Sequence, residues 1–404
     1  GTPLGFAQLN AVAIVGTDTI DGSFVYTPDL GTVLHTGISQ ALHVAFTPNN
    51  DALYESVSGD NTINVYKAPL TIIAVNDTIV YGEPIPELNV SYSGFVNGDD
   101  AGVLSVEPVA SLSSGDGINA GDYTISLSAT SSNDYEITYQ TGVFVVEKAT
   151  LTVTAHKQTK VYGQSNPVLT FEYDGFVNND VIADLDEEPV AVTIIDELSN
   201  AGYYTGAITF TGGNDNNYKF DFVPGDFEIT KATLTVTAHN QTKVYGQSKP
   251  ELTFEYSGFV NNDDVSDLDD EPIISTTINE LSNAGLYTDS ITFTGGNDNN
   301  YKFDFVPGDF EITKATLTVT AHKQTKVYGQ SNPVLTFEYD GFVNNEGISD
   351  LDEEPTISTT INALSNAGLY TDSIILSGGA ADNYAFNLVP GDFKITKAQL
   401  TVKA

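Results

Sequence analysis

Apolar and polar side chains alternate along several short runs of this 404-residue chain. The run 150–155 (Thr-Leu-Thr-Val-Thr-Ala) places Leu151, Val153 and Ala155 on one face and threonines on the other, and 218–222 (Tyr-Lys-Phe-Asp-Phe) alternates in the same way. A period of two residues is typical of half-buried β-strands. Clusters of Gly, Asn and Pro separate the runs and predict turns. The pattern therefore predicts a mainly β protein of small Ig-like or β-sandwich-type modules.

The alternating runs belong to a long internal repeat, and the dipeptide Lys-Ala marks its start. Lys-Ala recurs at Lys67, Lys148, Lys231, Lys314 and Lys397, at intervals of 81, 83, 83 and 83 residues, and residues 212–239 are identical to 295–322. Such self-similarity is the signature of a tandem array. The array divides into repeat 1 (67–147), repeat 2 (148–230), repeat 3 (231–313) and repeat 4 (314–396), with 397–404 as the first strand of a following module.

One segment in each repeat departs from the alternation. In repeat 2 it runs from Asp180 to Leu185, and in each repeat the Leu stands ten residues after the glycine of a Gly-Phe-Val-Asn motif. An Asp or Asn precedes the segment, which is the residue type that caps a helix. We therefore expect one short helix per repeat.

The boundary between repeats has no linker composition. Residues 227–236 (Phe-Glu-Ile-Thr-Lys-Ala-Thr-Leu-Thr-Val) contain neither Gly nor Pro, whereas flexible joints are rich in Gly and Ser or are long and polar. We therefore expect five tandem modules, one before the array and four within it, to form an extended rod. Each repeat should span about 35–40 Å if its core strands hold about ten to twelve residues.

The ordered motifs of the array resemble a known family. Each repeat carries Tyr-Gly-x-x-x-Pro, Gly-Phe-Val-Asn followed by an acid, and Ala-Gly, and repeats 2–4 end in Gly-Asp-Phe-x-Ile-Thr-Lys-Ala. In this order the motifs resemble the MBG repeats of bacterial surface and adhesin proteins. Residues 1–66, with Tyr26-Thr27-Pro28 and 44–48 (Val-Ala-Phe-Thr-Pro), resemble a bacterial Ig-like repeat that lacks its first strand.

The resemblance implies a secreted or cell-surface bacterial protein with a structural or adhesive role, as in biofilm, and it brings no catalytic residues. Our main hypothesis is a stalk or extracellular fibre segment, because near-identical units add length. The alternative is a direct adhesin whose modules bind a glycan or protein receptor, with avidity from repetition. The absent strand at one end and the spare strand at the other have two explanations. Either the chain is a window cut from a longer protein, or copies donate strands head to tail in a fibre.

The amino-acid composition makes several classes of partner unexpected. It also implies that the fold is stabilised by packing and backbone pairing, without disulfides. The chain has 54 acidic and 15 basic residues, a net charge of −39, no Arg and no Cys. Nucleic acid binding requires clustered Lys or Arg, so neither nucleic acid nor an anionic membrane surface is an expected partner. Without Cys there is no disulfide and no thiolate chemistry. No run approaches the about 20 apolar residues of a spanning helix, so no membrane insertion is expected in this segment.

Clustered acids before a Glu-Pro pair are the candidate metal ligands. Several carboxylates in one loop could bind Ca²⁺, although no EF-hand spacing is present. Repeat 1 keeps only Asp99, Asp100 and Glu107, so the fold cannot require such a site in every repeat. A solvated acidic loop without cofactor is the alternative. The calcium candidates are Asp180, Asp184, Asp186, Glu187 and Glu188 in repeat 2, and Asp263, Asp264, Asp267, Asp269, Asp270 and Glu271 in repeat 3.

Other chemistry-bearing residues do not predict a site. His156, His239 and His322 stand one repeat apart and cannot share a metal ion. Tyr173, Tyr204 and Tyr218 could stack on sugars, but burial in the core or at its edge is the simpler interpretation. A glycosidase needs two acids across a cleft, whereas here the same acids recur in adjacent small modules. We therefore expect no enzyme activity.

Overall fold

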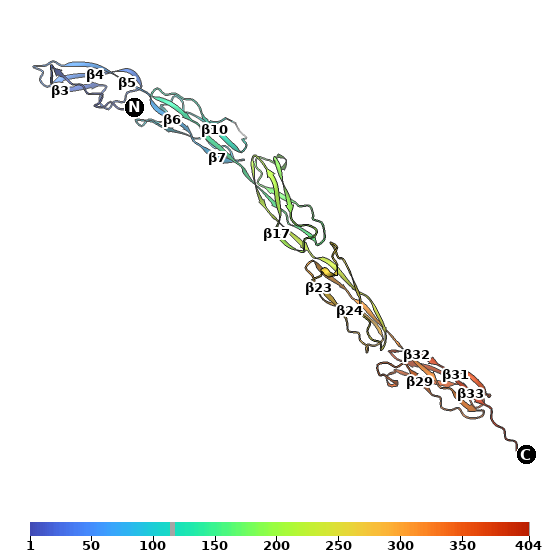
Figure 1. Cartoon of the computed structure of the whole chain (residues 1–404). Helices are drawn as coiled ribbons and strands as arrows, with labels where there is room; N and C mark the ends of the chain where they lie inside the picture. Colours follow the sequence, from blue (N-terminus) through green and yellow to red (C-terminus); the bar gives the residue numbers. More distant parts are fainter. Residues whose placement is uncertain (114–117, 404) are drawn as a thin grey trace. The chain divides into compact units, whose positions relative to one another are not determined.

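The computed structural model describes residues 1–113 and 118–403. Its strands, drawn as arrows in Figure 1, supply nearly all of the regular structure. The chain divides into two compact units whose boundary falls inside repeat 2. One unit comprises Gly1–His156, Leu169–Thr193 and Ile208–Gly225, and the other comprises Lys157–Val168, Ile194–Ala207 and Asp226–Ala404.

The N-terminal module is built on a three-stranded antiparallel sheet in the order β3-β4-β5, beside the two-stranded sheet β1-β2. Leu4, Leu9 and Leu42 form its small buried cluster. The N-terminal segment is held to the module by backbone pairing between the Leu4 N–H and the Thr32 carbonyl, at 2.9 Å. The strands are β1 (Ile14–Val15), β2 (Asp18–Thr19), β3 (Gly22–Thr27), β4 (Gly37–Pro48) and β5 (Val57–Val65).

Repeat 1 has two sheets, in the orders β11-β6-β8 and β7-β12-β10-β9. Its first strand, β6, is central in the three-stranded sheet, parallel to β11 and antiparallel to β8. The described elements are β6 (Ala68–Ala74), β7 (Asp77–Val80), β8 (Val90–Ser93), η1 (Ala101–Val103), β9 (Ala110–Leu112), β10 (Gly121–Leu127), β11 (Tyr135–Gln140) and β12 (Gly142–Glu147).

Repeat 2 has the same elements in the same order. Its sheet β15-β13-β18 again has the first strand at the centre; β14 pairs with β19 in parallel, and β16 pairs with β17 antiparallel. The elements are β13 (Ala149–Ala155), β14 (Gln158–Val161), β15 (Phe171–Asp174), η2 (Ile182–Asp184), β16 (Glu187–Thr193), β17 (Gly202–Asn214), β18 (Tyr218–Val223) and β19 (Gly225–Thr230).

Repeats 3 and 4 repeat the topology, with the sheet orders β22-β20-β25 and β21-β26-β24-β23, then β29-β27-β32 and β28-β33-β31-β30. Repeat 3 contains β20 (Ala232–Ala238), β21 (Gln241–Val244), β22 (Phe254–Ser257), η3 (Val265–Asp267), β23 (Asp270–Thr276), β24 (Gly285–Asn297), β25 (Tyr301–Val306) and β26 (Gly308–Thr313). Repeat 4 contains β27 (Ala315–Ala321), β28 (Gln324–Val327), β29 (Phe337–Asp340), η4 (Ile348–Asp350), β30 (Glu353–Thr359), β31 (Gly368–Ala380), β32 (Tyr384–Val389) and β33 (Gly391–Thr396).

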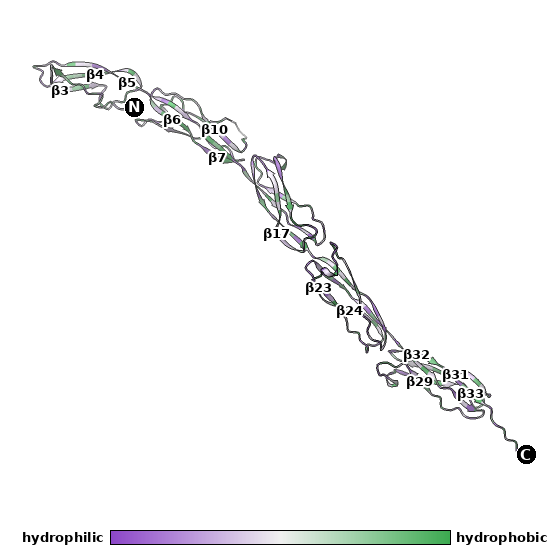
Figure 2. Cartoon of the chain, viewed as in Figure 1, coloured by the Kyte–Doolittle hydropathy of each residue, from purple (hydrophilic) through white to green (hydrophobic). Residues whose placement is uncertain are grey.

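The core lies between the two sheets, as the alternation predicts. In repeat 4, Val319 and Ala321 of β27 pack in one cluster with Ile374 of β31 and with Phe393 and Ile395 of β33. The prediction of inward apolar residues is confirmed, because alternate positions of every first strand are buried. Green and purple stretches alternate along the strands in Figure 2 for this reason. The all-β class and the repeated sandwich-type module are therefore confirmed.

The expected short helix is present only as a single 3₁₀ turn. In repeat 3 it covers Val265–Asp267, and the Asp264 carboxylate caps it by accepting from the Ser266 N–H at 2.8 Å. Such short length is usual for a 3₁₀ helix, because its hydrogen-bond geometry is poorer than that of an α-helix. None of the helices in the described ranges is long and apolar enough to cross a membrane.

The predicted near-continuity of backbone between repeats is confirmed. Strand β19 ends at Thr230 and β20 begins at Ala232, and β26 and β27 are likewise separated by one residue. Residues 397–403, by contrast, form no strand, and Leu400 is exposed. The equivalent strand β27 pairs with β29 and β32 of its own repeat. The assignment of 397–404 to a further module therefore stays a prediction.

Candidate functional site: the junctions between modules

The tyrosine of each Tyr-Gly pair in repeats 1–3 crosses into the following repeat. Its hydroxyl donates to the carboxylate that stands five residues after the glycine of Gly-Phe-Val-Asn. All three tyrosines are at least nine-tenths buried, so each hydrogen bond is shielded from water. The pairs are Tyr81 with Asp180 (3.1 Å), Tyr162 with Asp263 (3.0 Å) and Tyr245 with Glu346.

Each of these carboxylates also accepts from a tyrosine of its own repeat. Tyr218 donates to Asp180 at 2.8 Å, and Tyr301 donates to Asp263 at 2.7 Å. Burial raises the pKa of Tyr218 to about 12, so this hydroxyl keeps its proton and remains a donor at ordinary pH. At each junction one carboxylate thus joins a buried tyrosine from either side. At the third junction, the hydroxyls of Tyr245 and Tyr384 both donate to the Glu346 carboxylate.

A glycine and a valine make the junction close-packed. A Cβ added to Gly163 would lie 2.4 Å from a methyl carbon of Val260, and one added to Gly246 would lie 2.4 Å from Val343. Gly163 and Gly246 also have φ values of +79° and +80°, which residues other than glycine adopt only at a cost. Steric fit and backbone conformation therefore both require glycine after the tyrosine.

An asparagine makes the third contact across each junction, after the tyrosine–carboxylate hydrogen bonds and the packing of glycine on valine. Asn300 Oδ1 accepts from the backbone N–H of Ala201 at 2.9 Å, and its Nδ2 donates to Asn200 Oδ1 at 3.2 Å. The same pair of hydrogen bonds joins Asn217 to repeat 1 and Asn383 to repeat 3. The Ala-Gly motif of one repeat and the Asn-Tyr pair of the next (Asn217-Tyr218, Asn300-Tyr301 or Asn383-Tyr384) are therefore the two sides of a junction.

The hydrophobic core continues across the junctions. One buried cluster includes Phe144 of repeat 1 together with Leu151 and Tyr218 of repeat 2. Another includes Phe310 of repeat 3 together with Leu317 and Tyr384 of repeat 4. Adjacent repeats within each cluster therefore share buried apolar surface as well as hydrogen bonds.

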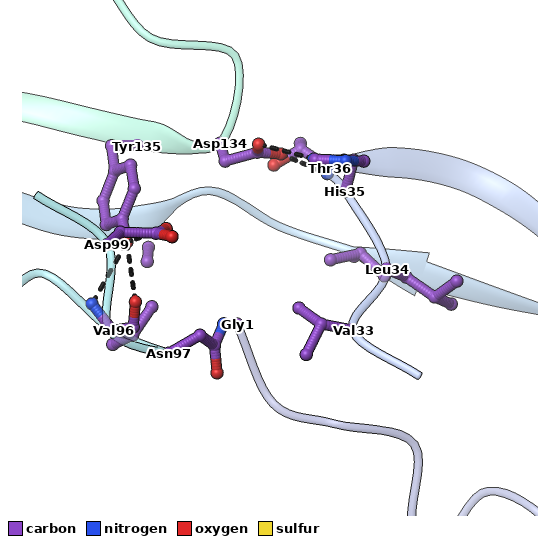
Figure 3. Close-up of a pocket in the computed structure, with 12 residues that line it drawn as sticks. Gly1, Val33, Leu34, His35, Thr36, Val96, Asn97, Asp99, Asp134 and Tyr135 are labelled. Atoms are coloured by element: carbon purple, nitrogen blue, oxygen red, sulfur yellow. Dashed lines mark hydrogen bonds and ion pairs between the residues drawn. The ribbon is translucent and has the colours of Figure 1, made fainter. Parts of the chain in front are cut away.

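The junction between the N-terminal module and repeat 1 is built differently (Figure 3). Asp134 takes the place of the asparagine, and its carboxylate accepts from the Thr36 N–H at 2.7 Å and contacts the His35 ring at 2.8 Å. The hydrogen bond to Asp134 raises the pKa of His35. The pKa of the Asp134 carboxyl is lowered by the Thr36 N–H and then by His35.

This junction also contains a cavity of about 350 Å³. Val96 and Asn97 of repeat 1 line it together with Gly1 and Leu34 of the N-terminal module. Asp99, the junction carboxylate of repeat 1, accepts from Tyr135 of its own repeat at 2.7 Å. The N-terminal module has no Tyr-Gly pair to offer as a second donor.

The carboxylates predicted to bind calcium do not converge on one point. Most of them accept hydrogen bonds from different backbone and side-chain groups. Asp180 and Asp263 are the junction carboxylates described above. Among the residues 1–113 and 118–403, no three His, Asp or Glu side chains come together in a way that could hold a metal ion. Calcium binding, which these residues were predicted to support, stays a prediction.

The remaining candidates serve the loop around the 3₁₀ turn. Asp184 and Asp267 accept from the backbone N–H three residues earlier, at 2.8 Å in both repeats. The pKa of Asp264 is lowered by its hydrogen bonds from the Ser266 hydroxyl and N–H. Asp186 and Asp269 accept from the backbone of the Asn-rich loop, at 2.9 Å. The remaining four are the first two residues of strands β16 and β23, namely Glu187, Glu188, Asp270 and Glu271.

The histidine candidates lie apart from the junctions, whereas Tyr218 belongs to a junction and to the core. His156 contacts Thr170 at 3.1 Å through Nδ1, and His239 and His322 contact the equivalent threonines. Tyr218 is 3 % exposed, so its burial is confirmed. The Tyr173 hydroxyl is buried without a hydrogen-bond partner in the structure, and the nearby Glu188 adds to burial in raising the pKa of this residue.

The comparison with protein families decides the nature of the repeats. The family described as MBG domain (YGX type) matches residues 70–145, 151–228, 234–311 and 317–394. The chain belongs to this family. Each match lies inside one repeat, so the resemblance inferred from the motifs is confirmed.

Other comparisons add little to the MBG assignment. Among solved structures, the I9–I11 tandem from titin covers 61 % of this chain and 100 % of its own, at 12 % identity and a TM-score of 0.18. A search of curated proteins found no match.

Proposed function

We propose that this chain is a spacer segment of a bacterial surface protein, located outside the cell. In it the tandem MBG modules hold a neighbouring part of the protein at a distance. Its role is mechanical rather than catalytic. The observation that carries the proposal is the recurrence of one junction at all three boundaries between MBG modules.

The junction favours stiffness for three reasons. One residue separates the last strand of an MBG module from the first strand of the next, as at Thr230 and Ala232, so no flexible linker intervenes. Buried hydrogen bonds cross the boundary, and the apolar clusters extend over it. Bending would expose Tyr245 and break its bond to Glu346, and buried polar groups are costly to leave unpaired.

The acidic surface supports a role as a spacer that stays separate from its neighbours. A net charge of −39 with no Arg keeps neighbouring chains apart by repulsion. Repetition of one module adds length without adding new binding specificity.

Distance measurements between pairs of spin labels test this proposal directly. The chain has no Cys, so two introduced cysteines carry the only labels. Lys219, Lys302 and Ala385 are exposed and occupy the same position in repeats 2, 3 and 4. We expect narrow distance distributions centred at about 35–40 Å for Lys219→Cys/Lys302→Cys and for Lys302→Cys/Ala385→Cys.

Broad distributions in both pairs would show free bending and contradict a spacer. Saturable binding of the chain to members of a glycan array would favour the direct adhesin instead, because a pure spacer offers no such site.

A further inference from the structure

In repeat 4, the face that repeats 1–3 each present to the following repeat has no module packed against it. We call this face the open half of an MBG junction. Tyr328 is the counterpart of Tyr81, Tyr162 and Tyr245, but it is 45 % exposed, whereas they are 9 %, 6 % and 3 % exposed. A Cβ added to Gly329 would meet nothing within 4 Å, whereas a Cβ at the corresponding glycines of repeats 1–3 would collide with a valine. Ala367 is likewise exposed, whereas Ala284 is half-buried and donates its N–H to Asn383.

The open half retains the geometry of the closed ones. Gly329 has a φ of +87°, close to the +80° of Gly246 and the +79° of Gly163. The Tyr328 N–H donates to the Thr396 carbonyl at 2.9 Å, as the Tyr245 N–H donates to Thr313. The open half in repeat 4 is therefore preorganised for binding, because docking requires little rearrangement of its backbone.

We propose that this face, formed by Tyr328, Gly329 and Ala367, docks a further module of the MBG type. The partner is defined by its chemistry. It offers a valine to cover Gly329, a carboxylate to accept from the Tyr328 hydroxyl, and an asparagine to accept from the Ala367 N–H. Val343, Glu346 and Asn383 make these contacts one junction earlier.

A second copy of this chain does not offer that partner. The loops with Val177, Val260 and Val343 are already covered by the preceding repeats. The corresponding loop of repeat 1 lies against the N-terminal module, where a Cβ on Gly1 would be 2.4 Å from Val96. The occupant is thus an additional MBG module joined through the 396–398 backbone, where attachment gives a high effective concentration. This inference extends the proposed spacer function by naming what the spacer joins.

Nitration of tyrosine by tetranitromethane, mapped by mass spectrometry, tests the proposal. The first protein is the 404-residue chain, and the second is residues 1–396 followed by a copy of residues 231–313. We expect Tyr328 to react in the first and to react about tenfold less in the second, toward the level of Tyr162, which is 6 % exposed and lies outside the copied residues. Tyr66, which is 73 % exposed, should react equally in both. Cleavage after lysine places Tyr162 and Tyr328 in different peptides.

Two variants of the extended protein are the matched controls. Val260→Asp in the appended copy alone removes the residue that covers Gly329, and Gly329→Ala introduces a Cβ where that valine would lie. Each should restore nitration of Tyr328. Gly329→Ala in the 404-residue chain shows whether the substitution alone changes reactivity, and hydrogen exchange verifies that the appended copy is folded.

Equal nitration of Tyr328 in the first two proteins, with a folded copy, would overturn the proposal. Protection that persists in the Val260→Asp copy would also overturn it, because the docking would not then use this contact. Concentration-dependent protection in the 404-residue chain would indicate that a second copy is the occupant instead. The spin-label distances report on the junctions between repeats 2, 3 and 4. The proposed spacer function and the proposed docking surface are therefore tested independently of each other.

Discussion

The two kinds of junction use the same face of an MBG module with different chemistry. Between MBG modules, a neutral asparagine accepts a backbone N–H, and a carboxylate joins two buried tyrosines. Between the N-terminal module and repeat 1, the asparagine position holds Asp134, which meets His35, and a cavity of about 350 Å³ lies beside the contact of Gly1 with Val96. The comparison teaches that the position before the buried tyrosine changes with the neighbour: it is Asn where another MBG module precedes and Asp134 where the N-terminal module precedes.

The close packing of glycine on valine should give the largest effect. Gly246→Val places a Cβ 2.4 Å from a methyl carbon of Val343, whereas a Cβ at position 329 in the open half meets nothing within 4 Å. Both substitutions carry a similar backbone strain, about 1–2 kcal/mol. We expect Gly246→Val to cost about 2–3 kcal/mol more, because overpacking a filled site is destabilising.

Hydrogen exchange resolved by segment is the suitable measurement, since a chain of several modules does not unfold in one two-state step. The difference should be confined to peptides around Tyr245 and Val343. Equal destabilisation by Gly246→Val and Gly329→Val would show that the glycine is needed for its backbone conformation alone.

The tyrosine hydroxyl should contribute less. Tyr245→Phe removes the donor to Glu346 while keeping the ring, and we expect a loss of about 1 kcal/mol in local stability. Tyr328→Phe should change nothing measurable, because its hydroxyl has no partner across an open face. Denaturant-dependent exchange of the segment around residue 245 measures the loss, and an identical response to both variants would contradict a junction role for the hydroxyl.

Dependence on pH should distinguish the N-terminal junction from the others. The pKa of His35 is raised above 6.5, so the protonated ring contributes stability that is full below that pH and is lost as the pH rises through the raised value. The pKa of Asp134 is lowered below 3.8, so its contribution is present above that pH and is lost as the pH falls through the lowered value. This contact should be tightest between about pH 4 and 6.5.

An NMR titration of the His35 ring measures this coupling. Asp134→Asn introduces the residue that repeats 2–4 carry, and it should return the pKa of His35 toward its ordinary value. Nearby Asp99 also raises that pKa, so Asp99→Asn is the control and should shift it less. An unchanged titration in Asp134→Asn would show that the pair does not form in solution.

Calcium should have the smallest effect. Tyr81 and Tyr218 already donate to Asp180, and backbone N–H groups donate to Asp184 and Asp186. We therefore expect the melting curve to be unchanged by a chelator or by added Ca²⁺. A rise in melting temperature with Ca²⁺, which bound ligand would cause, would instead support the calcium site predicted from the acid cluster.

Much of the fold could be predicted from local pattern. The period of two residues in Thr-Leu-Thr-Val-Thr-Ala fixes which side chains are buried, because successive strand residues face opposite sides. The sequence pattern predicts a longer helix than the structure contains. Its capping aspartate and its leucine are present, but only one 3₁₀ turn forms between the neighbouring strands. The junction tyrosine and valine were visible as repeated residues, yet repetition alone does not tell which partner a residue meets.

The sequence by itself determined the repeat, the β class and the family, because these depend on order and spacing along the chain. Only the tertiary structure decided that Tyr81 belongs to the next repeat's carboxylate and that Asp180 joins two modules. It also decided that Lys160 is buried and donates to the Asp196 carbonyl. The physical reason is distance: these partners stand 99 and 36 residues apart in sequence, and only folding of the strands brings them within hydrogen-bonding reach.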